Sequence, residues 1–177
     1  MIGGLGRHHT DAGNAVSREG EMAPRRPVVL VVTEDREPSE TMSAWLRETG
    51  LEVITCPGPL APSYVCAGGR GELCPLAARA DVVVLDLFLG SDTVLKGTPA
   101  LELLRYYTDL GKPVVALQRL GDPAGPLVGD GVELVHWPPA RRALLRAVDS
   151  RLARAPRGRM RRWEASGSRQ RERGGWR

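Results

Sequence analysis

The sequence predicts an α/β fold, with a doubly wound, five-stranded parallel sheet in the strand order 2-1-3-4-5. Short unbroken runs of valine, leucine and other aliphatic residues recur along the chain. Such runs are typical of strands buried on both faces of a sheet. Helical patterns separate several of them, and strands that alternate with helices form parallel sheets. The expected strands are residues 27–32, 51–55, 82–87, 113–118 and 131–136.

Two helices are expected in the first half of the domain. Ser39 is a suitable N-cap for the first helix, because its hydroxyl can accept a hydrogen bond from a free backbone N–H. Met42 and Leu46 lie on its apolar face, and Gly50 would end it. Residues 74–80 form a second, brief helix.

Two further helices are expected toward the C-terminus. Thr98 followed by Pro99 is a common helix start, and Gly111 would end that helix. Its helical period runs through Leu101, Leu104 and Tyr107. Residues 119–130 are rich in Gly and Pro and carry too few signals for a full helix. The last helix begins near Pro138, with Leu144, Leu145, Val148 and Leu152 on one face.

Composition divides the chain into three parts. Residues 1–26 are polar and Gly-rich without apolar periodicity, so we expect a disordered extension, with Met22 as an alternative start of translation. Residues 27–153 form the predicted domain. Residues 154–177 hold nine arginines and two glutamates, a net charge of +7, so residues 1–153 carry a net charge of −3. We expect this basic tail to be disordered.

The sequence also limits location and chemistry. No stretch approaches the ~20 apolar residues that cross a bilayer, and the N-terminal part lacks the apolar segment of a secretion signal. We therefore expect a soluble, cytoplasmic protein without membrane contacts. No nucleophile–histidine arrangement, phosphate-binding glycine loop or dinucleotide motif is visible, so we do not expect an enzyme.

Asp86 is the most informative residue, because it ends the run of aliphatic residues at 82–85. A carboxylate is costly to bury without a partner. The carboxyl ends of strands are where open α/β sheets place ligands and chemistry. The predicted strand order brings Glu34 and Asp35, which follow the first strand, beside Asp86. The three carboxylates would form one acidic pocket.

Residues 27–153 resemble the receiver domain of bacterial two-component response regulators. The matching segments are VVLVVTED at 28–35, DVVVLDL at 81–87, GTPALELL at 97–104 and PVVAL at 113–117. The resemblance implies that Asp86 accepts a phosphoryl group from a histidine kinase. It also implies that Glu34, Asp35 and Asp86 hold Mg²⁺, which neutralises the transferring oxygens.

The chain departs from the receiver pattern at several positions. The first acid of the usual pair would fall on Thr33. Gln118 stands where the family has a serine or threonine after the fourth strand, and Trp137 replaces the lysine after the fifth. Lys96 and Arg119 are candidate replacements for that cation, although no sequence feature places either one at the pocket. The resemblance therefore indicates an atypical receiver or pseudo-receiver.

Three cysteines, Cys56, Cys66 and Cys74, lie in a segment rich in Cys, Pro and Gly at 56–74. Clustered thiolates can bind Zn²⁺ or an iron–sulfur cluster if a fourth ligand is available. The candidates for that ligand are His8, His9 and His136. Two of the cysteines could instead form a redox-sensitive disulfide. Incidental free thiols are the third interpretation.

The basic tail at 154–177 is a candidate nucleic-acid contact. Arginines bind phosphates by releasing counterions, and Trp163 and Trp176 could stack on bases. A GC-rich reading frame would produce the same composition without a function.

Two functional hypotheses remain. In the first, the chain is a stand-alone receiver that is phosphorylated on Asp86 and binds a histidine kinase or another signalling protein. In the second, it is a receiver-like scaffold whose cysteine segment binds a metal or senses redox state, without phosphotransfer.

Overall fold

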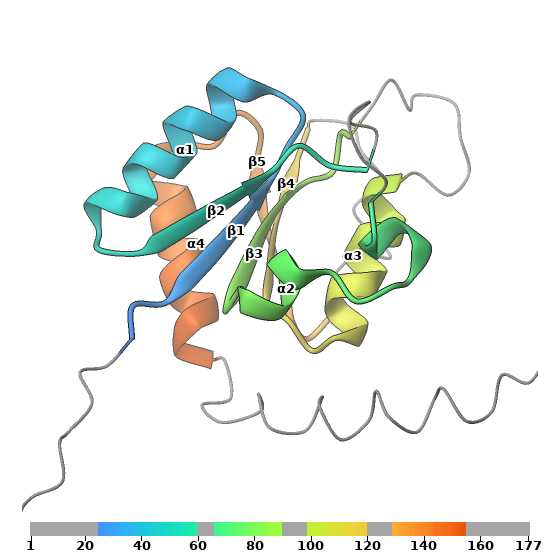
Figure 1. Ribbon diagram of the computed structural model, residues 1–177. Coiled ribbons are helices and arrows are strands. Elements are labelled where there is room, and N and C mark those ends of the chain that lie inside the picture. Colours follow the sequence, from blue (N-terminus) through green and yellow to red (C-terminus); the bar gives the residue numbers. More distant parts are fainter. Residues whose placement is uncertain (1–24, 60–65, 90–98, 120–128, 155–177) are drawn as a thin grey trace, which may run out of the picture.

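The sheet has the predicted order. In the computed structural model, which describes residues 25–59, 66–89, 99–119 and 129–154, five parallel strands pair in the order β2-β1-β3-β4-β5 (Figure 1). The strands are β1 (Val28–Val32), β2 (Glu52–Cys56), β3 (Val82–Asp86), β4 (Val114–Gln118) and β5 (Val132–His136). The expectation of a doubly wound parallel sheet is confirmed.

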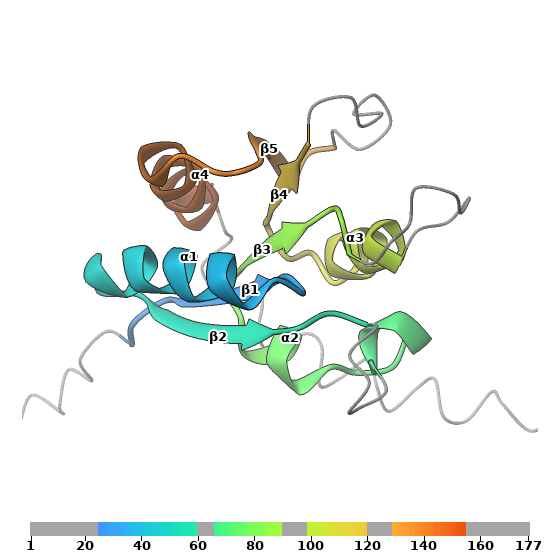
Figure 2. The same cartoon turned by 90° about the horizontal axis from the view of Figure 1, so that it is seen from above.

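Helices cover both faces of the sheet. Helices α1 (Arg36–Glu48) and α4 (Arg141–Arg154) lie on one face (Figure 2). The other face carries α2 (Pro75–Arg79), α3 (Pro99–Asp109) and the 3₁₀ turn η1 (Gly68–Arg70). None of the described helices combines the length and the apolar character needed to cross a bilayer.

The two faces explain the unbroken apolar runs. Alternate side chains of a strand point to opposite faces of a sheet. On β1, Leu30 and Val32 belong to the core beneath α2 and α3, whereas Val29 and Val31 belong to the core beneath α1 and α4. Every residue of β1, β3 and β4 is buried. These strands therefore carry apolar residues at consecutive positions.

The first helix begins earlier than expected. Its N-cap is Asp35, in an extended conformation, and Ser39 is buried inside the helix rather than capping it. The Asp35 side chain makes no capping hydrogen bond, and its backbone carbonyl accepts the bond from the N–H of Ser39 that begins the helix almost directly after β1. Gly50, with φ of +86°, follows the end of α1 as predicted.

The last two helices differ from expectation in detail. The buried face of α3 is formed by Ala100, Leu103, Leu104 and Tyr107, whereas Leu101 is only half-buried. Helix α4 begins at Arg141, three residues after Pro138. The carbonyl oxygen of Ala140 accepts bonds from the N–H groups of residues 143 and 144. The first helical turn therefore forms after Pro138 and Pro139.

We expect Leu144→Ala to lower the free energy of unfolding by about 2–5 kcal/mol, because it leaves a cavity between α4 and the sheet. Leu144 is fully buried in that core. Leu73 is 55% exposed, so Leu73→Ala is the matched control and should change stability by less than about 0.5 kcal/mol. Denaturant unfolding measures both, and equal effects would contradict the packing described.

Candidate functional site at the carboxyl ends of the strands

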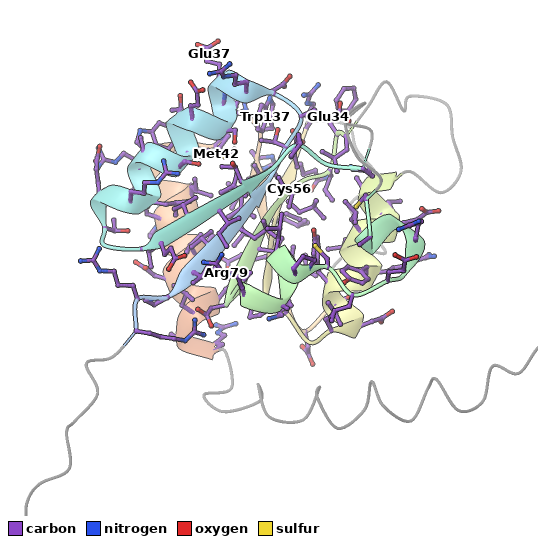
Figure 3. All side chains as sticks on the ribbon, in the orientation of Figure 1. Glu34, Glu37, Met42, Cys56, Arg79 and Trp137 are labelled. Carbon is purple, nitrogen blue, oxygen red and sulfur yellow. The ribbon has the colours of Figure 1, made fainter. Side chains whose placement is uncertain are left out.

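The carboxyl ends of four neighbouring strands meet at one end of the sheet. Asp86 ends β3, between the ends of β1 and β4, and pairs in register with Leu117. Gln118 on β4 pairs with His136 on β5. Figure 3 labels Glu34 and Trp137 at this end, with Arg79 toward the opposite end. The ends of these strands therefore lie together, whereas one acidic pocket formed by Glu34, Asp35 and Asp86 stays a prediction.

Asp86 is buried and hydrogen-bonded on both oxygens. Only 1% of its surface is exposed. Its Oδ2 accepts a bond of 3.0 Å from the Thr33 hydroxyl, and its Oδ1 accepts one of 2.9 Å from the backbone N–H of Phe88. In the sequence, Thr33 is recognised only as the position where receivers have the first acid of their usual pair. The structure places it, 3% exposed, as a direct partner of Asp86.

Opposing effects act on the acidity of Asp86. Burial is the largest and raises the pKa of the carboxyl group above its ordinary value of 3.8. The bonds from Phe88 and Thr33 favour the ionised form and lower the pKa, as does the positive charge of Arg119. The negative charge of Asp35 raises it. The net shift is upward.

Arg119 is the cation at this site. It follows β4 directly, and its guanidinium carbon lies 3.7 Å from the centre of the Phe88 ring and 5.5 Å from that of the Trp137 ring. These distances place the cation against both aromatic rings. Arg119 was one of two candidate cations in the sequence, and the other, Lys96, lies outside the described residues.

The two predicted metal-side acids have different surroundings. Both are exposed, but Asp35 is close enough to influence the pKa of Asp86. The aliphatic part of Glu34 lies over Gly58, in the segment after β2. Within the described ranges, no group of three or more His, Cys, Asp or Glu side chains is arranged to hold a metal ion.

Asp35 and Asp86 nevertheless fit one mode of Mg²⁺ binding. This ion commonly uses one or two carboxylates and completes its shell with water and phosphate oxygens. Each oxygen of an ionised Asp86 accepts one protein hydrogen bond and can accept more. A metal role for Glu34, Asp35 and Asp86 stays a prediction.

Gln118 and Trp137 lie together at the ends of β4 and β5. Gln118 is buried, with 9% of its surface exposed. The backbone carbonyl oxygen of Gln118 accepts a bond of 2.7 Å from the backbone N–H of Trp137. The indole packs partly against the core beneath α1 and α4, and the peptide bond to Pro138 is cis. Trp137 therefore contributes packing and an uncharged aromatic face beside Arg119.

The three cysteines lie around Tyr107 of α3. Cys56 is buried in the core beneath α2 and α3, and Cys66 and Cys74 are half-buried against it. None of the three forms a disulfide. Burial is the main cause of the raised pKa of Tyr107, and each cysteine adds to it. The cysteines therefore share one environment on the face of the sheet covered by α2 and α3.

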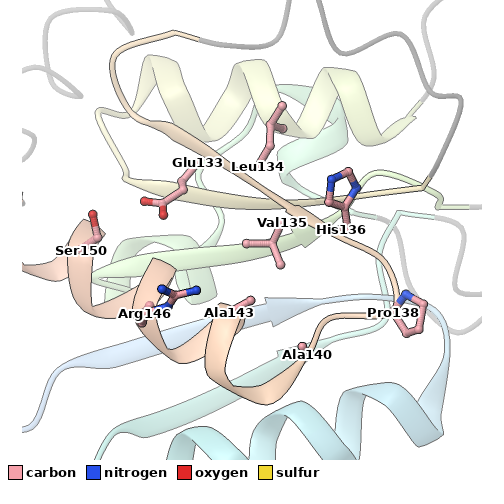
Figure 4. A pocket seen from close by; sticks show the side chains of 9 residues that line it. All are labelled: Glu133, Leu134, Val135, His136, Pro138, Ala140, Ala143, Arg146 and Ser150. Atoms are coloured by element: carbon pink, nitrogen blue, oxygen red, sulfur yellow. The ribbon is translucent and has the colours of Figure 1, made fainter.

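His136 does not join the cysteines. It lies at the end of β5 and lines a groove of about 680 Å³ between β5 and α4 (Figure 4). Apolar residues Val135, Ala140 and Ala143 form part of this groove, with Glu133 and Arg146 as charged neighbours. Within the described ranges, β5 is an edge strand, and the groove runs along it.

Several predictions fall outside the described residues. They include the disorder of 1–24, His8 and His9 as metal ligands, and nucleic-acid binding by 155–177. Arg154, placed in the tail by composition, is instead the last residue of α4. Arg25 in the predicted N-terminal extension forms an ion pair with Asp81.

Solved receiver domains share this fold. A receiver domain protein from Clostridium thermocellum has a TM-score of 0.54 and 21% sequence identity over 72% of this chain and 95% of its own. A putative response regulator from Chloroflexus aurantiacus has a TM-score of 0.53 and 21% identity over 73% and 100%. A Francisella response-regulator receiver domain has a TM-score of 0.52 and 20% identity over 73% and 98%.

No protein-family model and no curated protein matches the sequence. The likeness to the solved domains shows that the chain has the response-regulator receiver fold, as the sequence resemblance predicted. At 20–21% identity this likeness concerns the fold.

We expect Asp86→Asn to be more stable than the wild type near neutral pH. Because burial raises the pKa of Asp86 in the folded protein, the folded state binds a proton more tightly than the unfolded chain. Stability therefore falls as pH rises from the ordinary pKa through the raised one. Asparagine removes this ionisation, and its advantage should shrink as pH falls toward about 4.

Thermal or denaturant unfolding of both proteins between acid and neutral pH measures this difference. Asp109→Asn controls for the loss of a carboxylate at an exposed position. A wild type that gained stability over Asp86→Asn as pH rises would contradict the upward direction of the shift.

Proposed function

We propose that this chain is an atypical response-regulator receiver that acts in the bacterial cytoplasm by binding another signalling protein, with Asp86 as its phosphoacceptor. The surroundings of Asp86 support this proposal most directly. A buried carboxylate at the carboxyl end of the central strand has a hydroxyl, an amide and a guanidinium group around it. Receiver-fold neighbours support the signalling class.

The proposed chemistry is transfer of a phosphoryl group to the Asp86 carboxylate. The donor is a phosphohistidine of a histidine kinase, or a small acyl phosphate in its place. A carboxylate oxygen of Asp86 forms a bond to phosphorus while the bond from phosphorus to the donor nitrogen or oxygen breaks. The leaving group takes the electrons of the broken bond. The product is an aspartyl phosphate.

Thr33, Phe88 and Arg119 support this chemistry by keeping Asp86 oriented and available in its ionised form. Their hydrogen bonds and charge oppose the effect of burial on the pKa of Asp86. Asp35 and Asp86 would hold Mg²⁺, which supplies charge neutralisation for the phosphoryl oxygens when it is bound. The nearby Glu34 carboxylate is exposed to solvent. All these groups lie at one end of the sheet.

The substitutions at Gln118 and Trp137 make the proposed receiver atypical. A hydroxyl and a lysine occupy these two positions in the family that the sequence resembles. The Gln118 side chain is longer than that of serine or threonine, and the Trp137 ring carries no charge. We therefore propose that the response to phosphorylation differs from that of ordinary receivers.

We expect the purified chain to gain one phosphoryl group when incubated with acetyl phosphate and Mg²⁺, as measured by intact mass. Asp86→Asn should gain none, because the amide replaces the nucleophilic carboxylate. Asp109→Asn, at an exposed position on α3, should behave like the wild type. Absence of any gain in the wild type, or an equal gain in Asp86→Asn, would refute Asp86 as the phosphoacceptor.

A second candidate function is redox sensing by Cys66 and Cys74. These half-buried thiols lie at the two ends of the segment 66–74, which turns back on itself through bonds from the N–H groups at 70 and 72 to the Ala67 carbonyl. The Tyr106 hydroxyl accepts a bond from the Cys74 N–H and donates one to the Glu72 carbonyl, each at 2.9 Å. Both cysteines add to the raised pKa of Tyr106, which burial mainly causes.

We expect the oxidant diamide to take two hydrogen atoms from Cys66 and Cys74, forming a disulfide that dithiothreitol reverses. Intact mass and thiol counting measure this reaction. Cys66→Ser and Cys74→Ser should abolish it. Cys56→Ser should not, because Cys56 is only 8% exposed. Three free thiols after oxidation would exclude this function, and metal analysis of the untreated protein tests the metal-binding variant of the hypothesis.

A further inference from the structure

We infer that Arg119 binds the phosphoryl group placed on Asp86, and that Phe88 and Trp137 are positioning residues that hold its guanidinium group for that task. This inference rests on the proposed function and assigns the cation that it needs. The ligand class is a phosphoryl oxyanion attached to a carboxylate.

The first argument is the location of Arg119. It follows β4 directly, and β4 pairs with β3 through Asp86 itself. Its positive charge acts on the Asp86 carboxylate in the folded protein. The N–H of Leu87 bonds to the carbonyl of Leu117 at 3.0 Å, so pairing of the two strands continues past Asp86. The backbone that carries Arg119 is therefore fixed relative to the acceptor.

The second argument is the position of the two rings. The guanidinium carbon lies 3.7 Å from the centre of the Phe88 ring, and the N–H of Phe88 bonds to Asp86. The guanidinium carbon also lies 5.5 Å from the centre of the Trp137 ring, and the backbone N–H of Trp137 bonds to the backbone carbonyl of Gln118 on β4. Arg119 is thus held by neighbours attached to both flanking strands, β3 and β5.

The third argument is chemical. An arginine side chain offers a planar set of N–H donors that suits phosphate oxygens, and its flat face stacks on aromatic rings. Both properties can be used together, because the donors lie at the edge of the plane. A phosphoryl group brings a charge of about −2 at neutral pH. A guanidinium group already held beside the acceptor loses little freedom when it binds that charge.

The first test compares Arg119→Gln, Arg119→Lys and Arg79→Gln in the full chain. The measurement is the initial rate of phosphoryl incorporation from acetyl phosphate with Mg²⁺, by intact mass. Arg119→Gln should lower the rate by about ten- to a hundredfold, the loss expected for a charged hydrogen-bonding partner. Arg119→Lys should restore part of the rate. Arg79 pairs with Glu52 away from the site, so Arg79→Gln should retain the wild-type rate.

The second test examines the positioning role. Trp137→Leu should slow phosphoryl incorporation when Arg119 is present. It should have little further effect in the Arg119→Gln background, because both changes remove the same function, a guanidinium group held beside Asp86. Trp137→Phe keeps an aromatic face and should restore part of the rate. Phe88→Leu is the parallel variant if Trp137→Leu does not fold, and thermal unfolding of each variant establishes that it is folded.

The outcomes separate this inference from the proposed function. A wild type that gains no phosphoryl group refutes both. A wild type that is labelled on Asp86, with Arg119→Gln labelled equally fast, refutes only the role of Arg119. Equal effects of Trp137→Leu with and without Arg119 would show that Trp137 acts through general packing and overturn its positioning role.

Discussion

The buried carboxylate of Asp86 is the constraint on which this end of the molecule depends. A charge removed from water costs several kcal/mol unless hydrogen bonds and opposite charge compensate for it. Here the compensation comes from the Thr33 hydroxyl after β1, the Phe88 N–H after β3 and the Arg119 guanidinium after β4. Because these groups follow three neighbouring strands, the strand order determines whether Asp86 can be tolerated. Burial still prevails and leaves its pKa raised.

The same constraint gives a physical reason for the aromatic residues around Arg119. A long, flexible side chain would populate many rotamers, and holding it in one place costs conformational entropy. Phe88 and Trp137 restrict the guanidinium group by stacking. Trp137 occupies the position after β5 where the family that the sequence resembles has a lysine. In this chain the residue at that position carries no charge, and the positive charge lies on Arg119 after β4 instead. Charge comes from β4, and β5 contributes the surface that orients it.

The sequence was sufficient to predict the strands, their order and the position of Asp86 at the end of a buried strand, because a strand buried on both faces carries an unbroken run of aliphatic residues. It was not sufficient to place Arg119 against Phe88 and Trp137, because contacts between side chains at the ends of different strands leave no periodic pattern in the sequence. The role of Thr33 was missed for a similar reason: a threonine after a strand carries no signal until the residue opposite it is known.

Hydrogen bonding to Asp86 does not by itself make the residue merely structural. An ionised carboxylate has about four acceptor sites on its two oxygens, and the two bonds from Thr33 and Phe88 occupy only part of that capacity. The same bonds favour ionisation, which a nucleophile requires, and they fix the direction of the group. Structural compensation and reactivity therefore demand the same neighbours. What distinguishes a reactive acid from a structural one is a cation placed to receive additional negative charge, and Arg119 is the residue in the described part of the site that meets this condition.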